Sequence, residues 1–227
     1  MKITINLAAS LNEICRIHLQ NGIISSHAHS LIVKSINELI LSGIVKQSLK
    51  VGDIVPNFIL PNAFGQPIEL QNLLASGAVV ISFFRGHWCP LCSLELEALQ
   101  QALPAIQTLG AALIAISPQT PHYTTLTVVK QEITYEVLSD RRNDVARQFG
   151  IVFQIPEYLR PVFQEQGHVL PKYNGDESFE LPIPATFVVS QEGKVVYAFV
   201  DPDYTKRLDP IEIVSILRNI SMFNKSD

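Results

Sequence analysis

The feature that most constrains the fold is the stretch Phe83-Phe84-Arg85-Gly86-His87-Trp88-Cys89-Pro90-Leu91-Cys92, which ends in a Cys-x-x-Cys motif. It follows the apolar run Val79-Val80-Ile81, which predicts a buried strand. It precedes a segment from Ser93 to about Leu109 with the periodicity of a helix. A strand that ends in Cys-x-x-Cys and leads into a helix is typical of a redox-active dithiol.

The position of the two cysteines at a helix start predicts their reactivity. Their spacing places Cys89 and Cys92 on one face of the first helical turn. The unpaired N–H groups and the positive end of the helix dipole favour a thiolate there, which lowers the pKa of the exposed cysteine. Pro90 fits the first turn because its fixed φ is compatible with a helix. Trp88 is expected to shield one side of the site from water.

Composition and charge exclude several classes of protein. The net charge of −4 has mixed signs, so nothing indicates binding to nucleic acid or to an acidic membrane surface. No run reaches the ~18 to 20 apolar residues of a membrane span, and the N-terminus shows no signal-peptide pattern. Three cysteines, one of them the odd Cys15, argue against a secreted disulfide scaffold. We therefore predict a cytoplasmic protein without membrane or nucleic-acid partners.

Along the chain, strand and helix patterns alternate after a helical preface. Cys15 falls on a helical pattern and is expected to pack as a small hydrophobe, and Ser25 or Ser26 can cap the second helix. Two helices are expected within residues 1–50 and an antiparallel lead-in over 51–78. The central strands are expected at Val79–Phe84, Ala111–Ile116 and Tyr135–Leu138, with helices at Pro121–Gln131 and Asp144–Phe149. An irregular segment over 151–183 with a short helix near Glu157–Gln166 comes next, followed by a hairpin of Thr186–Ser190 and Lys194–Phe199 and a closing helix from Pro210 that Asp209 caps.

This order resembles the thioredoxin fold, an α/β class with a central mixed sheet flanked by helices. The first two strands should be parallel because a helix crosses between them. In that fold the hairpin runs antiparallel to them, so the start of the Thr186 strand should lie beside the cysteines. Pro184 is then the candidate for the cis-proline that flanks the dithiol, the alternative being a trans residue that ends a loop. The segments Ser117–Thr120 and Asp201–Tyr204 should lie on the same rim.

Several motifs in sequence order resemble the peroxiredoxins, the alkyl hydroperoxide reductase and thiol-specific antioxidant family. The resemblance covers about residues 48 to 222, which we treat as one domain, with 1–47 as a helical extension and 223–227 as a tail. The motifs are Val51-Gly52-Asp53 through Pro56-Asn57-Phe58, Phe83 through Leu96, Ala115 through Thr120, Leu138-Ser139-Asp140, Pro184 through Val189, and Phe199 through Arg207.

Compared residue by residue, the match is incomplete. The family's Pro-x-x-x-Thr-x-x-Cys motif places its peroxide-attacking cysteine on Cys92, its threonine on Cys89 and its proline on Arg85. The family's later arginine falls on Pro184. The chain therefore lacks two partners that orient the peroxide and stabilise the thiolate. Arg85 is either a replacement for the missing positive charge or a salt-bridge residue at a strand end, and both readings stay open.

Two mechanisms follow from the resemblance. In the first, Cys92 attacks a hydroperoxide, Cys89 resolves the sulfenic acid to a disulfide, and thioredoxin or a similar dithiol restores the thiols. In the second, Cys89 attacks a disulfide substrate and Cys92 resolves the mixed disulfide. A redox-inactive binding module on the same fold is a third hypothesis, and a zinc site on the two cysteines would need further ligands.

The leading prediction is a peroxiredoxin-like peroxidase. Its candidate catalytic residues are Cys89 and Cys92, and its candidate supporting residues are Arg85, Trp88, Pro90, Pro184 and Thr186. No metal or organic cofactor is expected because the dithiol carries the electrons. The expected partners are a hydroperoxide or disulfide substrate and a thioredoxin-like reductant, with a homodimer as a further candidate assembly.

Overall fold

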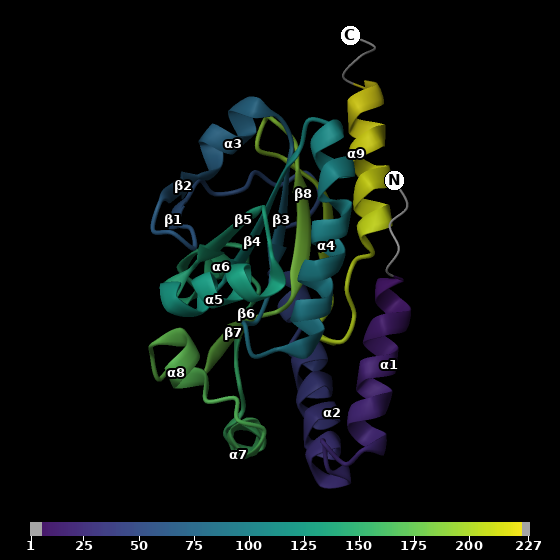
Figure 1. The fold of residues 1–227 in the computed structure, drawn as a ribbon, viewed down its shortest axis with the longest axis vertical. Helices are drawn as coiled ribbons and strands as arrows, with labels where there is room; N and C mark the ends of the chain where they lie inside the picture. The colour runs from purple at the N-terminus through teal and green to yellow at the C-terminus, as the bar shows by residue number, and fades with distance from the viewer. Residues whose placement is uncertain (1–5, 224–227) are drawn as a thin grey trace.

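A five-stranded mixed sheet forms the centre of the molecule (Figure 1). The computed structural model describes residues 6–223. Of the predicted tail over 223–227, residue 223 is the last residue of helix α9 (Pro210–Phe223), and 224–227 lie outside the described residues. Strand β3 pairs in parallel with β4 and antiparallel with β8, as the sequence predicted. The strands, in the sheet order β5-β4-β3-β8-β9, are Glu136–Ser139, Ala112–Ser117, Val79–Phe83, Ala185–Val189 and Val195–Val200.

The alternation of side chains along β3 divides the core into two layers. Val80 belongs to the layer that also contains Cys89 and Cys92. Val79 and Ile81 belong to the layer on the opposite face of the sheet. Every residue of β3 is buried, which explains why this strand appears in the sequence as a continuous apolar run.

Helices cover both faces of the sheet. Helix α4 (Pro90–Thr108) packs on the cysteine face beside α9 (Pro210–Phe223), as Figure 1 shows. The start of α9 is capped as predicted, because Ile211 N donates to Asp209 Oδ1 at 2.9 Å. The other helices of the sheet domain are α3 (Leu70–Ser76), α5 (Pro121–Gln131), the 3-10 turn η2 (Arg141–Asn143) and α6 (Asp144–Gln148).

The lead-in before the sheet is the predicted hairpin. Strands β1 (Ile59–Pro61) and β2 (Pro67–Glu69) pair antiparallel. The turn between them is closed by Asn62, whose backbone N–H donates to the Gln66 carbonyl at 2.8 Å. Gly65 adopts a positive φ of 78° in this turn, a conformation that favours glycine.

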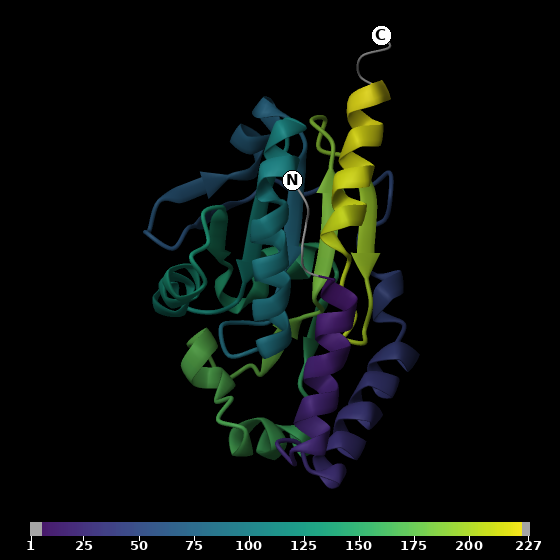
Figure 2. The same cartoon turned by 45° about the vertical axis from the view of Figure 1, so that its right-hand side comes forward.

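The two predicted N-terminal helices form a pair at one end of the molecule (Figure 2). They are α1 (Leu7–Gln20) and α2 (Ser26–Leu41), followed by the 3-10 turn η1 (Ile44–Lys46). Ser25, one of the two caps considered, accepts from Ala28 N at 3.1 Å. Helix α1 packs on α4 through Leu7 and Leu11, which are 1% and 3% exposed in the cysteine layer. Cys15 packs, partly buried, against the same layer, as predicted.

Residues 151–183 hold more regular structure than the sequence predicted. Strands β6 (Val152–Gln154) and β7 (Glu180–Pro182) pair antiparallel, and between them lie η3 (Glu157–Leu159), α7 (Arg160–Glu165) and α8 (Leu170–Asn174). Only the helix near residue 160 was expected. Three-residue strands beside proline carry no periodicity, so the sequence pattern could not reveal β6 and β7.

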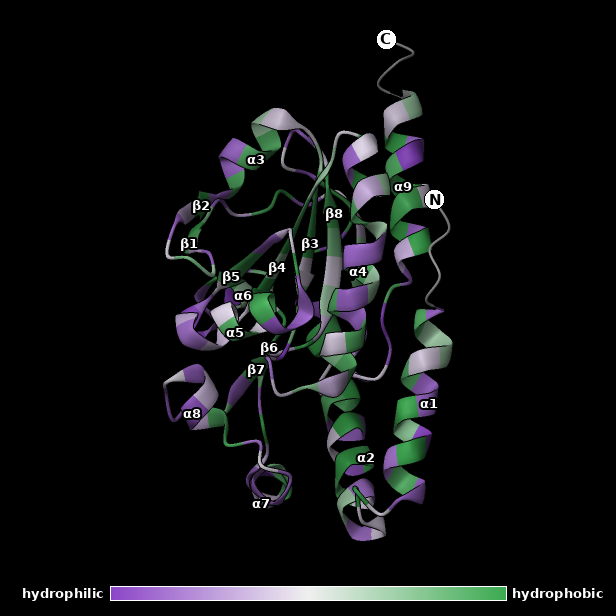
Figure 3. Cartoon of the chain, in the orientation of Figure 1, coloured by the Kyte–Doolittle hydropathy of each residue, from purple (hydrophilic) through white to green (hydrophobic). Residues whose placement is uncertain are grey.

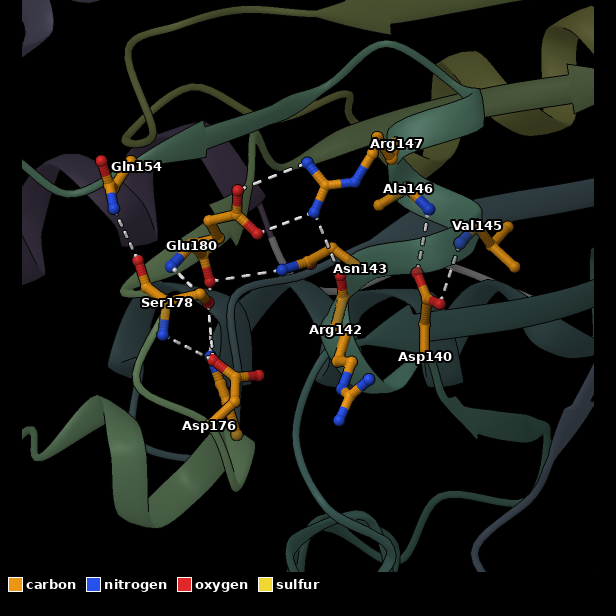
Figure 4. Close-up of polar contacts among 11 residues, drawn as sticks. Asp140, Arg142, Asn143, Val145, Ala146, Arg147, Gln154, Asp176, Ser178 and Glu180 are labelled. Atoms are coloured by element: carbon orange, nitrogen blue, oxygen red, sulfur yellow. Dashed lines mark hydrogen bonds and ion pairs between the residues drawn. The ribbon is translucent and has the colours of Figure 1, made fainter.

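A network of hydrogen bonds and an ion pair joins residues 151–183 to the helical turn that follows β5 (Figure 4). Arg147 of α6 forms an ion pair with Glu180 of β7 at 2.7 Å. Asn143 Nδ2 donates to the Glu180 carbonyl at 3.3 Å. The carboxylate of Asp140, which follows β5, accepts from the backbone N–H groups of Val145 and Ala146 at 2.9 Å each. The segment therefore has a fixed position relative to the strand ends.

The N-terminal pair contains one unexpected stretch. Within the described residues, Ser26–Lys46 is long and apolar enough to cross a membrane by length and composition alone, although no such stretch was expected from the sequence. Figure 3 shows hydrophobic residues along α2 as well as along the central strands. Ala28 and Ile32 of this helix are 5% and 8% exposed and belong to the cysteine layer of the core.

Candidate active site

The dithiol lies where β3 leads into α4. Helix α4 begins at Pro90, with Cys89 as its N-cap residue in an extended backbone conformation. Cys89 Sγ accepts a hydrogen bond from Cys92 N at 3.3 Å, which satisfies one of the unpaired donors of the first turn. Both cysteines are 0% exposed and unbonded to each other. The placement of Cys89, Pro90 and Cys92 therefore agrees with the first-turn geometry predicted from the sequence.

Arg85 is the first cation at the site. Its Nη2 donates to Cys89 Sγ at 3.0 Å. Its guanidinium carbon lies 4.0 Å from the Tyr204 ring centroid and 5.0 Å from that of Trp88. The residue is only 6% exposed. Of the two readings the sequence left open for Arg85, the contact with a cysteine sulfur favours the replacement of the missing positive charge.

A second cation approaches from the far end of the chain. Arg207, in the loop between β9 and α9, has Nη2 at 3.6 Å from Cys92 Sγ. Its Nε pairs with Glu95 Oε2 at 2.7 Å, and the two side chains are 1% and 2% exposed. Arg207 Nη1 also donates to the Tyr204 carbonyl. Each cysteine sulfur thus has its own guanidinium.

The neighbouring charges and hydrogen bonds shift the pKa values of Cys89 and Cys92 in opposite directions. Burial by itself raises the pKa of Cys89, but the hydrogen bond from Cys92 and the charges of Arg85 and Arg207 together hold it well below its usual value. Burial and the hydrogen bond to Cys89 raise the pKa of Cys92. The reduced site therefore favours a Cys89 thiolate with a Cys92 thiol donating to it.

The surrounding ionisable groups respond to the same burial. Burial raises the pKa of Glu95 to about 7, and the neighbouring Arg207 opposes that rise. Burial alone would lower the pKa of Arg85, but the adjacent cysteine sulfurs raise it, so the guanidinium stays charged. His168, against the Trp88 ring at 4.9 Å between centroids, has its pKa lowered to about 4 by burial. His168 is therefore neutral near pH 7.

Two rim segments reach the site as the topology predicted. Gln119, after β4, accepts from His87 N at 2.7 Å through Oε1. Tyr204, after β9, covers the Arg85 guanidinium with its ring.

Trp88 is 8% exposed and packs edge-on against Phe163 at 5.6 Å between centroids. Trp88 therefore forms a wall of the site, in agreement with the shielding expected from the sequence.

The prediction of a cis peptide at Pro184 is wrong. The bond before Pro184 is trans, the isomer that X–Pro bonds favour by about 0.5–1 kcal/mol. The preceding residue is held by a hydrogen bond from Ile183 N to the Ile151 carbonyl at 2.8 Å, so the loop is fixed with a trans bond. Thr186 is buried on β8 opposite Ser82 of β3, on the face that α4 covers. No hydrogen bond joins either predicted supporting residue to the described cysteines.

Sequence reasoning gave no role to Arg207 and Glu95. Glu95 follows Cys92 by three positions on α4, a spacing that places the two side chains on one helix face. That spacing was a usable signal, because a carboxylate beside a buried thiol requires a partner cation. The partner lies 112 residues away in sequence, and only the fold reveals it.

The Trp88 indole packs directly against the backbone at Gly86. A Cβ at Gly86, where φ is +150°, would lie 2.6 Å from Trp88 Nε1. We expect Gly86→Ala to destabilise the fold by about 1–3 kcal/mol more than Gly52→Ala, because the added methyl must displace the buried ring. Gly52 has a φ of +99°, and a methyl added there would meet nothing within 4 Å, so it controls for backbone strain. Urea unfolding followed by circular dichroism measures the difference, and equal midpoints would contradict the expectation.

A dithiol at a helix N-cap, flanked by two buried arginines on a thioredoxin-like sheet, defines a thiol-dependent oxidoreductase. Comparison with known proteins agrees. The model of the AhpC/TSA family matches residues 51–198, and the chain belongs to this family. Helices α1 and α2 precede the matched residues, and Arg207 follows them.

The relatives include proteins named as peroxiredoxins and proteins named as thiol-disulfide oxidoreductases. A putative peroxiredoxin bcp of Buchnera aphidicola is 30% identical over 46% of this chain and 65% of its own length. The thiol-disulfide oxidoreductase ResA of Bacillus cereus is 22% identical over 73% of this chain and 85% of its own length. The crystal structure of peroxidoxin BcpB from Mycobacterium tuberculosis superposes with a TM-score of 0.60 at 23% identity, covering 76% of this chain and 98% of that one. This last likeness supports the fold.

Proposed function

We propose that the chain is a thiol-dependent peroxidase in which Cys89 attacks the hydroperoxide and Cys92 resolves the product. The observation that carries the proposal is the surroundings of Cys89 Sγ, which accepts from Arg85 Nη2 at 3.0 Å and from Cys92 N at 3.3 Å. Both donors stabilise a thiolate, and the thiolate is the nucleophilic form. The family motif alone would have assigned the attack to Cys92.

The proposed catalytic cycle uses the two cysteine sulfurs as its only redox groups. The Cys89 thiolate attacks the terminal peroxide oxygen, the O–O bond breaks, and the departing alkoxide takes the proton of the Cys92 thiol and leaves as an alcohol. The Cys92 thiolate formed in this way attacks the Cys89 sulfenic acid, which forms the disulfide and expels hydroxide, and a proton from solvent converts the hydroxide to water. Arg207, 3.6 Å from Cys92 Sγ, stabilises the Cys92 thiolate that this second step requires. A dithiol reductant such as thioredoxin returns both sulfurs to the reduced state by thiol–disulfide exchange.

This cycle suits a reducing compartment, and we propose the cytoplasm as its location. A dithiol reductant of the thioredoxin type is available there, and free thiols persist. The candidate supporting roles are the stabilisation of the thiolate by Arg85 and the exclusion of water by Trp88. Pro90 fixes the helix start. Pro184 precedes β8 and Thr186 lies on it, and no hydrogen bond joins either residue to the described cysteine sulfurs.

Single serine variants test the order of attack. Cys89→Ser is expected to lose rapid oxidation by hydrogen peroxide in stopped flow. Cys92→Ser is expected to consume about one peroxide per chain and then stop, because its sulfenic acid has no resolving thiol. Trapping with dimedone followed by mass spectrometry should place the label on residue 89. Cys15→Ser serves as the control and should cycle normally. Retention of the first-turnover rate in Cys89→Ser would assign the attack to Cys92.

Thiol–disulfide exchange is the second candidate function. The same N-cap thiolate would attack a disulfide substrate, and the similarity to proteins named ResA supports this alternative. The two candidates differ in their reaction with peroxide. Oxidation of the reduced protein by hydrogen peroxide at the slow rate of an unactivated thiol, together with fast reduction of a model disulfide, would favour exchange.

A further inference from the structure

A large cavity lies between the N-terminal helix pair and the chain from β6 to α7. Its volume is about 1300 Å³, above the ~300–1000 Å³ of most small-molecule sites. All five residues from Val152 to Pro156 line it. Side chains of a strand alternate between two faces, so an unbroken run of lining residues indicates that the backbone edge of β6 faces the cavity. Helix α2 forms another part of the wall, and Trp88 lines the cavity at the active site.

The outer edge of β6 carries free backbone groups. Strands β6 and β7 pair antiparallel, and in such a ladder only alternate residues bond to the partner strand. The Ile151 carbonyl and the Ile155 N–H each form a hydrogen bond of 2.8 Å on the β7 side. Val152 and Gln154, at the alternate positions, therefore direct their N–H and C=O groups away from β7. Within residues 6–223, no hydrogen bond satisfies these four groups.

The corresponding edge of β7 is closed. Glu180 lies opposite Gln154, so its backbone groups point away from β6. Its carbonyl accepts from Asn143 Nδ2 at 3.3 Å and from Asn174 Nδ2 at 3.4 Å, as Figure 4 shows for Asn143. Its N–H donates to Ser178 Oγ at 3.2 Å. The fold thus satisfies one edge of this two-stranded sheet with side chains and leaves the other edge open. An open strand edge recognises the backbone of an extended peptide.

Apolar side chains supply further contact surface in the cavity. Val33 on α2 is 42% exposed, and Ile36 and Leu39 of the same helix line the cavity partly buried. Phe163 of α7 lines it as well. Strand β6 has three residues, so strand pairing alone offers few hydrogen bonds. Burial of apolar side chains of a bound segment must therefore provide the rest of its affinity.

The charged residues of the lining favour a basic segment. Apart from histidines, the lining holds three acidic residues and one buried cation, Arg85. The acids Glu38 and Asp203 each have a partner among neighbouring side chains. Glu165, exposed on α7, forms no hydrogen bond or ion pair within the described part of the chain. A lysine or arginine on a bound segment complements this carboxylate.

We propose that the outer edge of β6 binds an extended segment of a partner polypeptide as an added strand. The segment carries alternating apolar side chains and a basic residue that reaches Glu165. Its backbone pairs with Val152 and Gln154, and its apolar side chains pack against α2. This role is separate from the proposed catalytic cycle, and it involves α2, which precedes the residues matched by the family model. A polypeptide held in this way enters the part of the cavity that Trp88 lines.

A synthetic peptide of alternating valine and threonine, with one terminal lysine and blocked ends, is the probe. It should bind the reduced protein saturably and change the emission of Trp88, the single tryptophan of the chain. In hydrogen exchange followed by NMR, the amides of Val152 and Gln154 should exchange at least about tenfold more slowly with peptide bound. The amide of Phe153, which faces β7 already, should change little. The same peptide N-methylated at every central residue cannot donate from either edge and should bind at least about tenfold more weakly.

Variants of the strand edge and of the acidic residue test the two parts of the site. Gln154→Pro should weaken peptide binding at least about tenfold, because proline has no N–H and its ring obstructs the incoming strand. Gln154→Val is the matched control, since it also loses the bond from Gln154 Nε2 to the Ser178 carbonyl but keeps the backbone donor, and it should bind like the wild type. Glu165→Gln should lower the affinity about two- to fivefold. Glu157→Gln, which changes an exposed acid outside the lining, should leave it unchanged.

Several results would overturn the proposal. Equal binding of the peptide and its N-methylated form would show that the cavity takes apolar ligands without strand pairing, and no binding of either would exclude the site. Wild-type affinity in Gln154→Pro with a native circular dichroism spectrum would also overturn it; if that variant does not fold, the two peptides on the wild-type protein still decide. A dimer in sedimentation whose Val152 and Gln154 amides are protected without peptide would assign the edge to a second copy instead. These readouts need no turnover, so failure of the proposed peroxidase function is a separate result.

Discussion

Arg85→Gln is expected to lower the rate constant for peroxide reduction by about 10²–10³. The change removes the charged donor that contacts Cys89 Sγ at 3.0 Å and leaves a neutral side chain in its place. Loss of one donor that stabilises developing negative charge typically costs this factor in catalysis. The loss of thiolate stabilisation can be measured separately as a rise in the pKa of Cys89. A hydrogen bond to a charged group contributes about 1.5–3 kcal/mol, and one pKa unit corresponds to about 1.4 kcal/mol, so the expected rise is about 1–2 units.

The pH dependence of the reaction in Arg85→Gln shows in which direction Arg85 shifts the pKa of Cys89. Arg85 lowers the pKa of Cys89, so its removal should move the midpoint of thiolate absorbance and of the rate profile to higher pH by about 1–2 units. Arg85→Lys keeps the charge without the fork of donors and should lie between the two proteins. An unchanged midpoint in Arg85→Gln, with circular dichroism showing a native fold, would contradict the assignment of Arg85 to Cys89.

Arg207→Met is expected to destabilise the fold by about 3–5 kcal/mol, measured by urea unfolding at pH 8. Glu95 and Arg207 are 2% and 1% exposed, so removal of the cation leaves a buried carboxylate without a partner. The penalty should shrink as the pH is lowered from 8 and already be reduced at pH 7. With Arg207 in place, burial raises the pKa of Glu95 to about 7, and loss of the cation that opposes this rise moves the pKa higher still, so Glu95 in the variant takes up a proton above pH 7 and then needs no counter-charge.

Two variants control for the loss of side-chain volume and of a generic ion pair. The double change Arg207→Met with Glu95→Leu should recover most of the lost stability, because it removes both buried charges. Arg16→Met removes the exposed pair with Glu13, whose side chains are each 52% exposed, and should cost about 0–1 kcal/mol. A similar small cost for Arg207→Met would show that the Glu95 pair contributes little to stability.

Local patterns were sufficient to predict the sheet and the dithiol. The apolar run of β3 and the cysteine spacing predicted that the two cysteines lie at the start of α4, and the crossover rule predicted that β4 is parallel to β3. The antiparallel direction of β8 followed from the resemblance to the thioredoxin fold. Arg85 was a candidate because it lies four residues from Cys89. These features depend on neighbours in sequence or on topology rules, so the sequence alone determines them.

Other features of the site depend on distances that the sequence does not encode locally. The ion pair of Arg207 with Glu95 joins the last loop to α4, and no periodic pattern links them. The trans bond at Pro184 follows Ile183, whose N–H donates to the Ile151 carbonyl just before β6, a strand that the sequence did not predict. The cavity between the N-terminal helices and residues 152–168 needs both parts in place, and their proximity follows only from the fold.

The position of Arg207 has a consequence for the order in which the protein matures. Cys89, Cys92 and Arg85 all precede the midpoint of the chain, whereas Arg207 enters only with the loop before α9. During synthesis the cysteines therefore exist for more than a hundred residues of elongation before Cys92 acquires its guanidinium and Glu95 its counter-ion. Because Arg207 lowers the pKa of both cysteines, neither sulfur has its full complement of cations until this loop has folded. On the proposed cycle, we therefore expect the dithiol to reach its full reactivity only after the C-terminal part of the chain is in place.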